Sequence, residues 1–249
     1  MTQKREADLI NLKIIKKTED VFPEETMILR ASTNFMRRLT QSSREALPHF
    51  DKHPNLRAIM ELFCRNRELA HFSIVCMINA GYAETKILSR VSMENFLLMR
   101  LLVIRPDLAS TWFVNIEKFR CEWSPKEVRK AVFNKKPERG SNYERFYWLL
   151  CDYTHPSFKG WFELFRRQND GVFISSRPEF NPDYASECIG LICFAMIQSV
   201  KVYVDSFKPW MDQKVVDEAN RLMPKLHEMV TRHFEVRIYN KKKLLEKRS

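Results

Sequence analysis

The stretch Tyr82–Ile104, YAETKILSRVSMENFLLMRLLVI, decides the fold that this sequence predicts. Gly81 precedes it and Arg105-Pro106 follows it, so it is bounded as a helix is. At about 100° per residue, one apolar stripe of this helix collects Ile87, Val91, Leu98, Leu101 and Leu102. Arg90 and Glu94 fall within that stripe. Because buried charges are costly unless they are paired, we expect the helix to carry a polar cluster into the core.

The composition fits one large helical domain. The chain has 249 residues, 45% of them hydrophobic and 29% charged, and only 5 glycines, which argues against a β-rich fold with many tight turns. We predict an all-α, mostly antiparallel bundle with at most one short strand or hairpin. Its parts are an N-terminal arm or short helix at 1–20, the helical domain at 21–238 and a basic tail at 239–249.

Helix signals recur along the domain. Proline in a first turn, polar N-caps and apolar periodicity mark most of these helices. The predicted helices span about 22–47, 55–79, 82–104, 106–119, 125–133, 143–153, 181–207 and 209–239. Residues 161–167 look like a further helical turn, and 171–175 like a short strand or extended loop. Pro224 predicts a kink or a break in the last helix.

The net charge and the cysteine pattern limit the kinds of partner and cellular compartment that the sequence predicts. A net charge of +11 favours an anionic partner, most simply nucleic acid, although a basic surface that only keeps the protein soluble is an equal alternative. Six cysteines form no Cys-x-x-Cys pair, so we expect a reducing compartment without disulfides or a zinc site. The longest apolar run, near 188–200, is shorter than the roughly 20 residues that span a bilayer. We therefore expect a cytoplasmic protein with no membrane partner, no metal and no cofactor.

The first candidate site combines Arg90, Glu94 and His155. Arg90 and Glu94 share a helix face by their spacing. His155 precedes Pro156, which suits the first turn of a following helix, and the dipole there would favour a neutral imidazole. These groups have the ingredients of general acid–base chemistry. The alternative is a buried structural clasp that ties a loop to the central helix.

Two further sets of residues could carry function. Arg65 and His71 have the spacing of an Arg-Asn-x4-His motif, but on an uninterrupted helix they lie about 120° apart, so a solvated face is the alternative. Cationic and aromatic side chains also alternate after residue 134, a combination that suits RNA or single-stranded DNA unless the aromatics are core. The cationic members are Lys135, Lys136, Arg139, Arg145, Arg166 and Arg167.

The motifs also resemble known proteins. Leu88–Glu94, with its Arg-x3-Glu pattern, and the distal Tyr153–Ser157 segment with His-Pro-Ser look like a bacterial helical family of unknown function over about residues 55–205. That family in turn resembles the HEPN superfamily (higher eukaryote and prokaryote nucleotide-binding), which includes metal-independent ribonucleases with an Arg-x4-6-His motif in a dimer cleft. Arg65-Asn66-x4-His71 matches that spacing but lies in an early helix rather than a late one.

The resemblance implies a HEPN-like cytosolic protein that binds or cleaves RNA in phage defence, toxin–antitoxin or stress-response systems. If it cuts RNA, His155 or His71 would move the proton and an arginine would stabilise phosphate charge. The alternative is a non-catalytic interaction or scaffold protein whose Arg-Glu-His cluster is structural. A small-ligand sensor with a pocket beside Arg90 is a third class. A homodimer and a protein partner both stay open.

Overall fold

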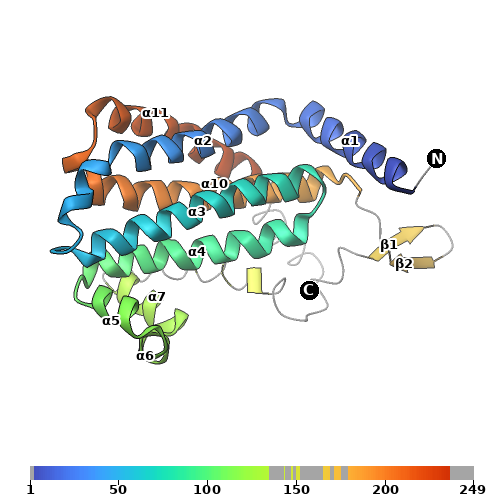
Figure 1. The fold of residues 1–249 in the computed structure, drawn as a ribbon. Coiled ribbons are helices and arrows are strands. Elements are labelled where there is room, and N and C mark those ends of the chain that lie inside the picture. Colours follow the sequence, from blue (N-terminus) through green and yellow to red (C-terminus); the bar gives the residue numbers. More distant parts are fainter. Residues whose placement is uncertain are drawn as a thin grey trace.

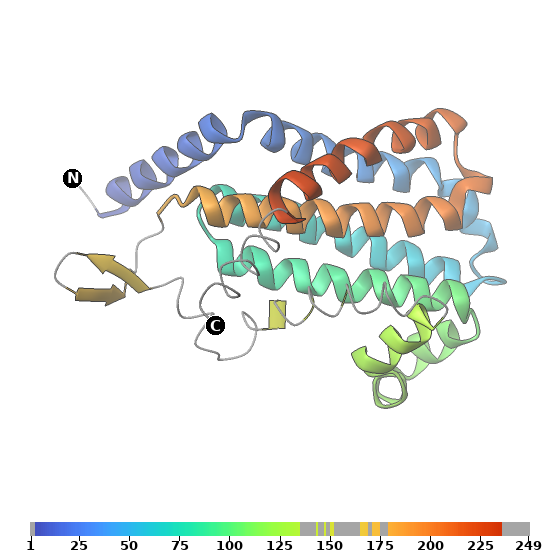
Figure 2. The same cartoon turned by 180° about the vertical axis from the view of Figure 1, so that it is seen from behind.

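Long helices packed side by side form the body of the protein, which confirms the predicted all-α bundle (Figure 1). The computed structural model describes residues 3–134, 143, 147, 150–151, 165–168, 171–174 and 179–235. The helices of the body are α2 (Pro23–Ser42), α3 (Pro54–Ile78), α4 (Tyr82–Ile104), α10 (Pro182–Phe207) and α11 (Gln213–Val230). α1 (Gln3–Val21) continues beyond one end of the bundle, as the view from behind also shows (Figure 2).

The central helix begins and ends where the sequence predicts, at Tyr82 and Ile104. It packs against α3 and α10 along its length and against a shorter helix near its C-terminal end. Its buried side differs from the predicted stripe, because Ile87 is 37% exposed and Val91 is half-buried. Lys86, one position before Ile87, is instead fully buried against α10. The apolar C-terminal half of the stripe, at Leu101 and Leu102, is buried as expected.

α10 is the most deeply enclosed helix of the body. Pro182 starts it and Asn181 caps it by accepting hydrogen bonds from the next backbone N–H groups. Among the described residues, Pro182–Trp210 is the one helical segment long and apolar enough to cross a membrane, yet 78% of its apolar window is buried inside the protein. Here that apolar surface fills the space between α2, α3, α4 and α11.

A subdomain of three short helices crosses one end of the α3–α4 pair (Figure 1). The predicted helix at 106–119 is broken in two, because the Asn115 side chain accepts a hydrogen bond from the Lys118 backbone N–H and starts a new helix. Ser124 caps the third helix as predicted, with Pro125 in its first turn. The three are α5 (Leu108–Val114), α6 (Ile116–Glu122) and α7 (Pro125–Phe133).

Other boundaries depart from the sequence predictions. The prediction of a helical turn at 161–167 is wrong, since Phe165–Gln168 forms strand β1. β1 pairs antiparallel with β2 (Gly171–Ile174), which lies where the sequence predicts a short strand or extended loop. Pro224 lies inside α11 without ending it. The α-helical part of the last helix ends at Val230, and a π-helical turn, η3, follows it directly. The short 3-10 and π elements are η1 (Arg44–His49), η2 (Lys208–Trp210) and η3 (Thr231–Glu235).

Candidate functional site

Arg90 and Glu94 contact each other one turn apart on α4, as their spacing predicts. Arg90 Nε lies 3.1 Å from Glu94 Oε1. The hydroxyl of Tyr147 joins them: it lies 3.2 Å from Glu94 Oε1, to which it donates, and accepts from Arg90 at 3.2 Å. Burial and the charge of Glu94 raise the pKa of Tyr147, so its hydroxyl stays protonated and able to donate.

The pair lies at the edge of the core rather than in it. The Arg90 and Glu94 side chains are 17% and 35% exposed, so the prediction that they are drawn into the core is wrong. The reason is that the α4 face covered by α3 and α10 is rotated from the apolar stripe, toward Lys86. His155, the predicted third member, lies outside the described residues.

Two arginines form cation–π contacts with the Tyr147 ring. Arg90 approaches its face with the guanidinium carbon 5.1 Å from the ring centroid, and Arg129 of α7 does so at 4.5 Å. Arg129 is buried, although it is the fifth residue of a short surface helix. Cation–π contacts of this kind strengthen when the cation is removed from water, so they fix the ring where α4 and α7 meet.

A second polar network, not predicted from the sequence, lies beneath this pair. Asn66 of α3 is buried and donates through Nδ2 to the Ser92 carbonyl at 3.1 Å and to Ser199 Oγ at 2.8 Å. Its Oδ1 accepts from Asn95 Nδ2 at 2.8 Å. Three helices are thereby joined through one amide. The signal for it was the set of apolar residues three and four positions to either side of Asn66, which places Asn66 on the apolar face of its helix: Leu62, Phe63, Leu69 and Ala70.

A cavity of about 400 Å³ opens between α4 and the α5–α7 subdomain. A volume of this size is in the range of small-molecule and nucleotide pockets. Its lining combines aromatic rings with three arginines and one carboxylate, so the charge that faces it is positive. The lining residues used below are Arg65, Glu94, Asn95, Trp112, Phe119, Arg120, Trp123, Arg129, Tyr143 and Tyr147.

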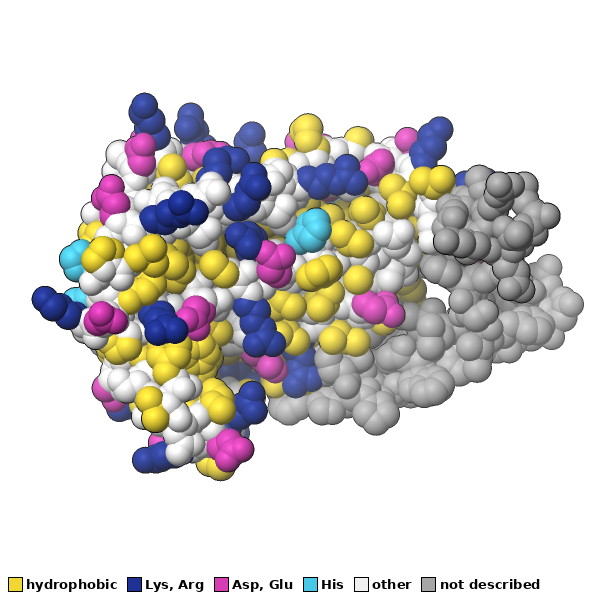
Figure 3. Space-filling view, viewed as in Figure 1, with side chains coloured by type: hydrophobic (Ala, Val, Ile, Leu, Met, Phe, Trp, Pro, Cys, Tyr) yellow, Lys and Arg dark blue, Asp and Glu magenta, His cyan; other side chains and the backbone are white. Residues whose placement is uncertain are grey.

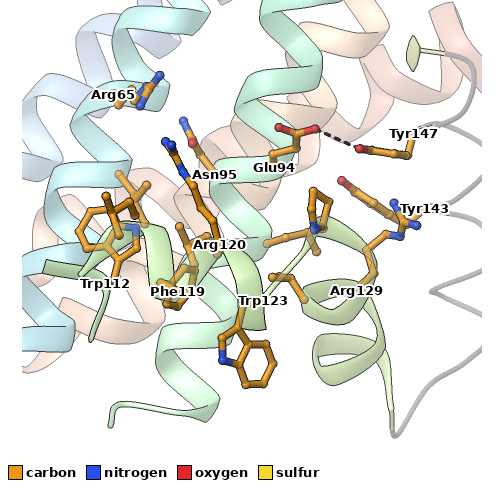
Figure 4. Close-up of a pocket in the computed structure, with 16 residues that line it drawn as sticks. Arg65, Glu94, Asn95, Trp112, Phe119, Arg120, Trp123, Arg129, Tyr143 and Tyr147 are labelled. Atoms are coloured by element: carbon orange, nitrogen blue, oxygen red, sulfur yellow. Dashed lines mark hydrogen bonds between the residues drawn. The ribbon is translucent and has the colours of Figure 1, made fainter. Parts of the chain in front are cut away.

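The polar groups are spread along the cavity in a definite order (Figure 4). Arg120 extends from α6 toward Asn95 and the α3 residue Arg65, which form one end. Glu94 lies in the middle, and Tyr143 and Tyr147 form the other end with Arg129. Lys and Arg side chains gather on the surface where α4 meets the subdomain (Figure 3). Neither Arg65 nor Arg120 forms an ion pair with any described residue.

Arg65 and His71 are not brought together. Arg65 lines the cavity, whereas His71 is exposed, does not line it, and contacts the Phe72 ring at 5.8 Å. The sequence argument that the two do not share a face agrees with this placement. No imidazole belongs to the described lining of the cavity.

The predicted basic and aromatic segment is described only in part. Tyr143 and Tyr147, two of its aromatic members, are helical and lie in the cavity wall. Arg166 and Arg167 lie in β1. The other basic members, Lys135, Lys136, Arg139 and Arg145, lie outside the described residues.

The described residues offer little to a metal ion. Within the described ranges, no three His, Cys, Asp or Glu side chains gather as ligands would. None of the six cysteines, all of which lie within the described residues, forms a disulfide. What the arrangement can do chemically is bind: it presents cations, hydrogen-bond acceptors and aromatic faces to one enclosed volume.

A scan against protein-family models, a search of curated proteins and a search of solved structures all return no match for this chain. The HEPN-like relationship therefore stays a prediction that depends on the short motifs alone.

Proposed function

We propose that the protein binds single-stranded RNA and that the cavity between α4 and α5–α7 receives one nucleotide. One observation carries the proposal: Arg65, Arg120 and Arg129 share this volume with tryptophan and tyrosine rings. Proteins that bind single strands combine cations that follow the phosphates with aromatic faces on which bases stack. The net charge of +11 would draw a polyanion to the surface that carries them.

Arg65 and Arg120 are suited to the phosphates. Both are exposed at one end of the cavity, and neither is neutralised by a described carboxylate. A guanidinium offers a rigid fork of donors that matches two phosphate oxygens. Arg129 has a different role, because it is buried against Tyr147 and holds the aromatic end in place.

Binding is proposed ahead of cleavage. Acid–base cleavage of RNA needs a group that moves a proton within reach of the reacting hydroxyl. The candidates from the sequence are His71, which lies away from the cavity, and His155, which lies outside the described residues. Incubation of labelled RNA with the wild-type protein and with His155→Ala tests this part separately: products that require the imidazole would add a ribonuclease activity to the binding.

The binding itself is tested by fluorescence anisotropy with a labelled single-stranded RNA at low salt. Arg120→Gln should weaken affinity about tenfold, since a hydrogen bond to a charged group contributes about 1.5 kcal/mol or more. It should also reduce the slope of log affinity against log salt by about 0.7. Lys118→Gln is the matched control, because it removes one exposed cation from the same helix outside the cavity.

Two outcomes would contradict the proposal. If no RNA binds at low salt, the interaction-protein alternative with a structural Arg90–Glu94 cluster takes its place. If RNA binds but Arg120→Gln and Lys118→Gln weaken it equally, the binding is a diffuse effect of surface charge and does not use the cavity.

A further inference from the structure

The cavity wall presents three polar groups whose hydrogen-bonding capacity is not used. Glu94 Oε1 accepts from both Arg90 and Tyr147, but Glu94 Oε2 accepts no hydrogen bond from the described residues. Asn95 donates through Nδ2 to Asn66, and its Oδ1 likewise accepts nothing from them. A carboxylate oxygen and an amide oxygen can only accept hydrogen bonds, so a ligand would satisfy both by supplying two donors.

The third group is the Tyr143 hydroxyl. It is buried and has no hydrogen-bond partner among the described residues, a costly state for a polar group. Burial raises the pKa of Tyr143, with the charge of Glu94 adding to the effect, so the hydroxyl keeps its proton and can donate. It points in the same direction as the Tyr147 hydroxyl, toward the Glu94 side of the cavity (Figure 4).

These groups follow one another along the cavity as donor, acceptor, acceptor: Tyr143, then Glu94, then Asn95 (Figure 4). The Watson–Crick edge of guanine presents the complementary order, a carbonyl acceptor at O6 followed by donors at N1 and N2. Adenine presents an amino donor at N6 and an acceptor at N1, which would place a lone pair against the Glu94 carboxylate. A donor that faces a donor, or an acceptor that faces an acceptor, leaves both groups without a hydrogen bond, so such a base is rejected strongly.

We propose that the base this cavity reads is guanine, an inference that rests on the RNA-binding function proposed above. Glu94 Oε2 accepts from N1–H, Asn95 Oδ1 accepts from the N2 amino group and the Tyr143 hydroxyl donates to O6. Arg90 and Tyr147 are positioning residues, since their contacts hold the Glu94 carboxylate at the cavity wall. The nucleotide phosphate then lies toward Arg65 and Arg120 at the other end.

The first test leaves the protein unchanged. Three labelled seven-nucleotide RNAs are compared by anisotropy at low salt, all adenosine except for guanosine, inosine or adenosine at the centre. Guanosine should bind at least about tenfold more tightly than adenosine, with inosine between them because it lacks the N2 amino group. Equal affinity of the three RNAs would overturn the guanine proposal while leaving RNA binding intact.

Free nucleotides separate the two proposals. GMP and AMP are titrated into the wild-type protein by calorimetry. If no RNA binds but GMP binds and AMP does not, guanine reading by the cavity is supported and the RNA-binding function fails. If neither RNA nor GMP binds, both proposals fail.

The second test changes the central acceptor. Glu94→Gln keeps an oxygen for Arg90 but replaces the carboxylate, so guanosine should lose most of its advantage while adenosine binding is unchanged or stronger. Glu84→Gln removes the same charge from the exposed first turn of α4 and should leave the preference as it is. A misfolded protein would lose affinity for the guanosine and the adenosine RNA alike. A Glu94→Gln protein that keeps the full preference for guanosine would overturn the proposal.

Discussion

Lys86 Nζ lies 3.3 Å from Glu187 Oε2, and this buried ion pair joins α4 to α10. The ammonium also lies 5.0 Å from the centre of the Tyr184 ring. Lys86→Met should lower the free energy of unfolding by about 3–5 kcal/mol, because it leaves the Glu187 carboxylate buried without its cation. Urea denaturation followed by circular dichroism measures the loss.

The matched variant is the double change Lys86→Met with Glu187→Leu. It removes both charges and fills the space with apolar groups, so it should recover most of the stability that the single change loses. If the double variant instead loses as much stability as Lys86→Met and Glu187→Leu lose in sum, the two residues do not interact in solution.

The ion pair also shows where the sequence argument succeeded and where it failed. Gly81 and Pro106 bound α4 through local backbone chemistry, so its ends were predictable. The side of α4 that is buried depends on how it packs with α3 and α10, and α10 is distant in sequence. Local periodicity could therefore not show that Lys86, rather than Arg90, is the buried cation. A charge buried against a partner about a hundred residues away leaves no periodic signal.

The candidate site was predictable to a similar degree. The contact between Arg90 and Glu94 followed from helical spacing, but the cavity beside them did not. Besides α4 itself, several separate segments contribute to it: α3 supplies Arg65, α6 supplies Arg120, and the helical residues Tyr143 and Tyr147 supply the tyrosines. The break at Asn115, which turns α6 beneath α4, is a capping event that periodicity alone did not separate from one continuous helix.

Glu25 and His233 should make stability depend on pH. His233 Nε2 lies 3.0 Å from Glu25 Oε1, and both residues are buried. Burial acts to raise the pKa of Glu25, but its backbone hydrogen bond, His233 and Arg232 outweigh it, so the pKa is lowered from its usual 4.5. A lowered carboxyl pKa gives stability that is present above the unfolded value and is lost as pH falls through the folded value.

The measurement compares wild-type protein with Glu25→Gln by urea denaturation between pH 7 and pH 3. The wild type should be the more stable above about pH 4.5, and the difference should shrink below it. Glu24→Gln is the control, because Glu24 is exposed and lies 3.7 Å from the same Arg232. A difference that does not change with pH would rule out the carboxylate as its source.

Asn66 should be needed for the stability of the fold. Asn66→Ala removes two donated hydrogen bonds and one accepted bond, and leaves Asn95 without its acceptor in the core. We expect a loss of about 2–4 kcal/mol in the free energy of unfolding, from unsatisfied polar groups and the space left behind. Thermal and urea denaturation measure it. Ser199→Ala, which removes one contact of the same network, should cost less; the reverse order would contradict the central place of Asn66.

The two tryptophans of the cavity should contribute stacking to RNA affinity. Trp112 and Trp123 are half-buried and belong to the cavity wall. Stacking on an aromatic ring contributes about 1–3 kcal/mol per base, so replacing both residues with leucine should weaken RNA binding about tenfold or more while keeping the wall apolar. Trp210→Leu is the control, because Trp210 is half-buried against Phe207 and lies away from the cavity. Anisotropy titrations compare the three proteins, and equal affinity in all of them would place the bound base outside this cavity.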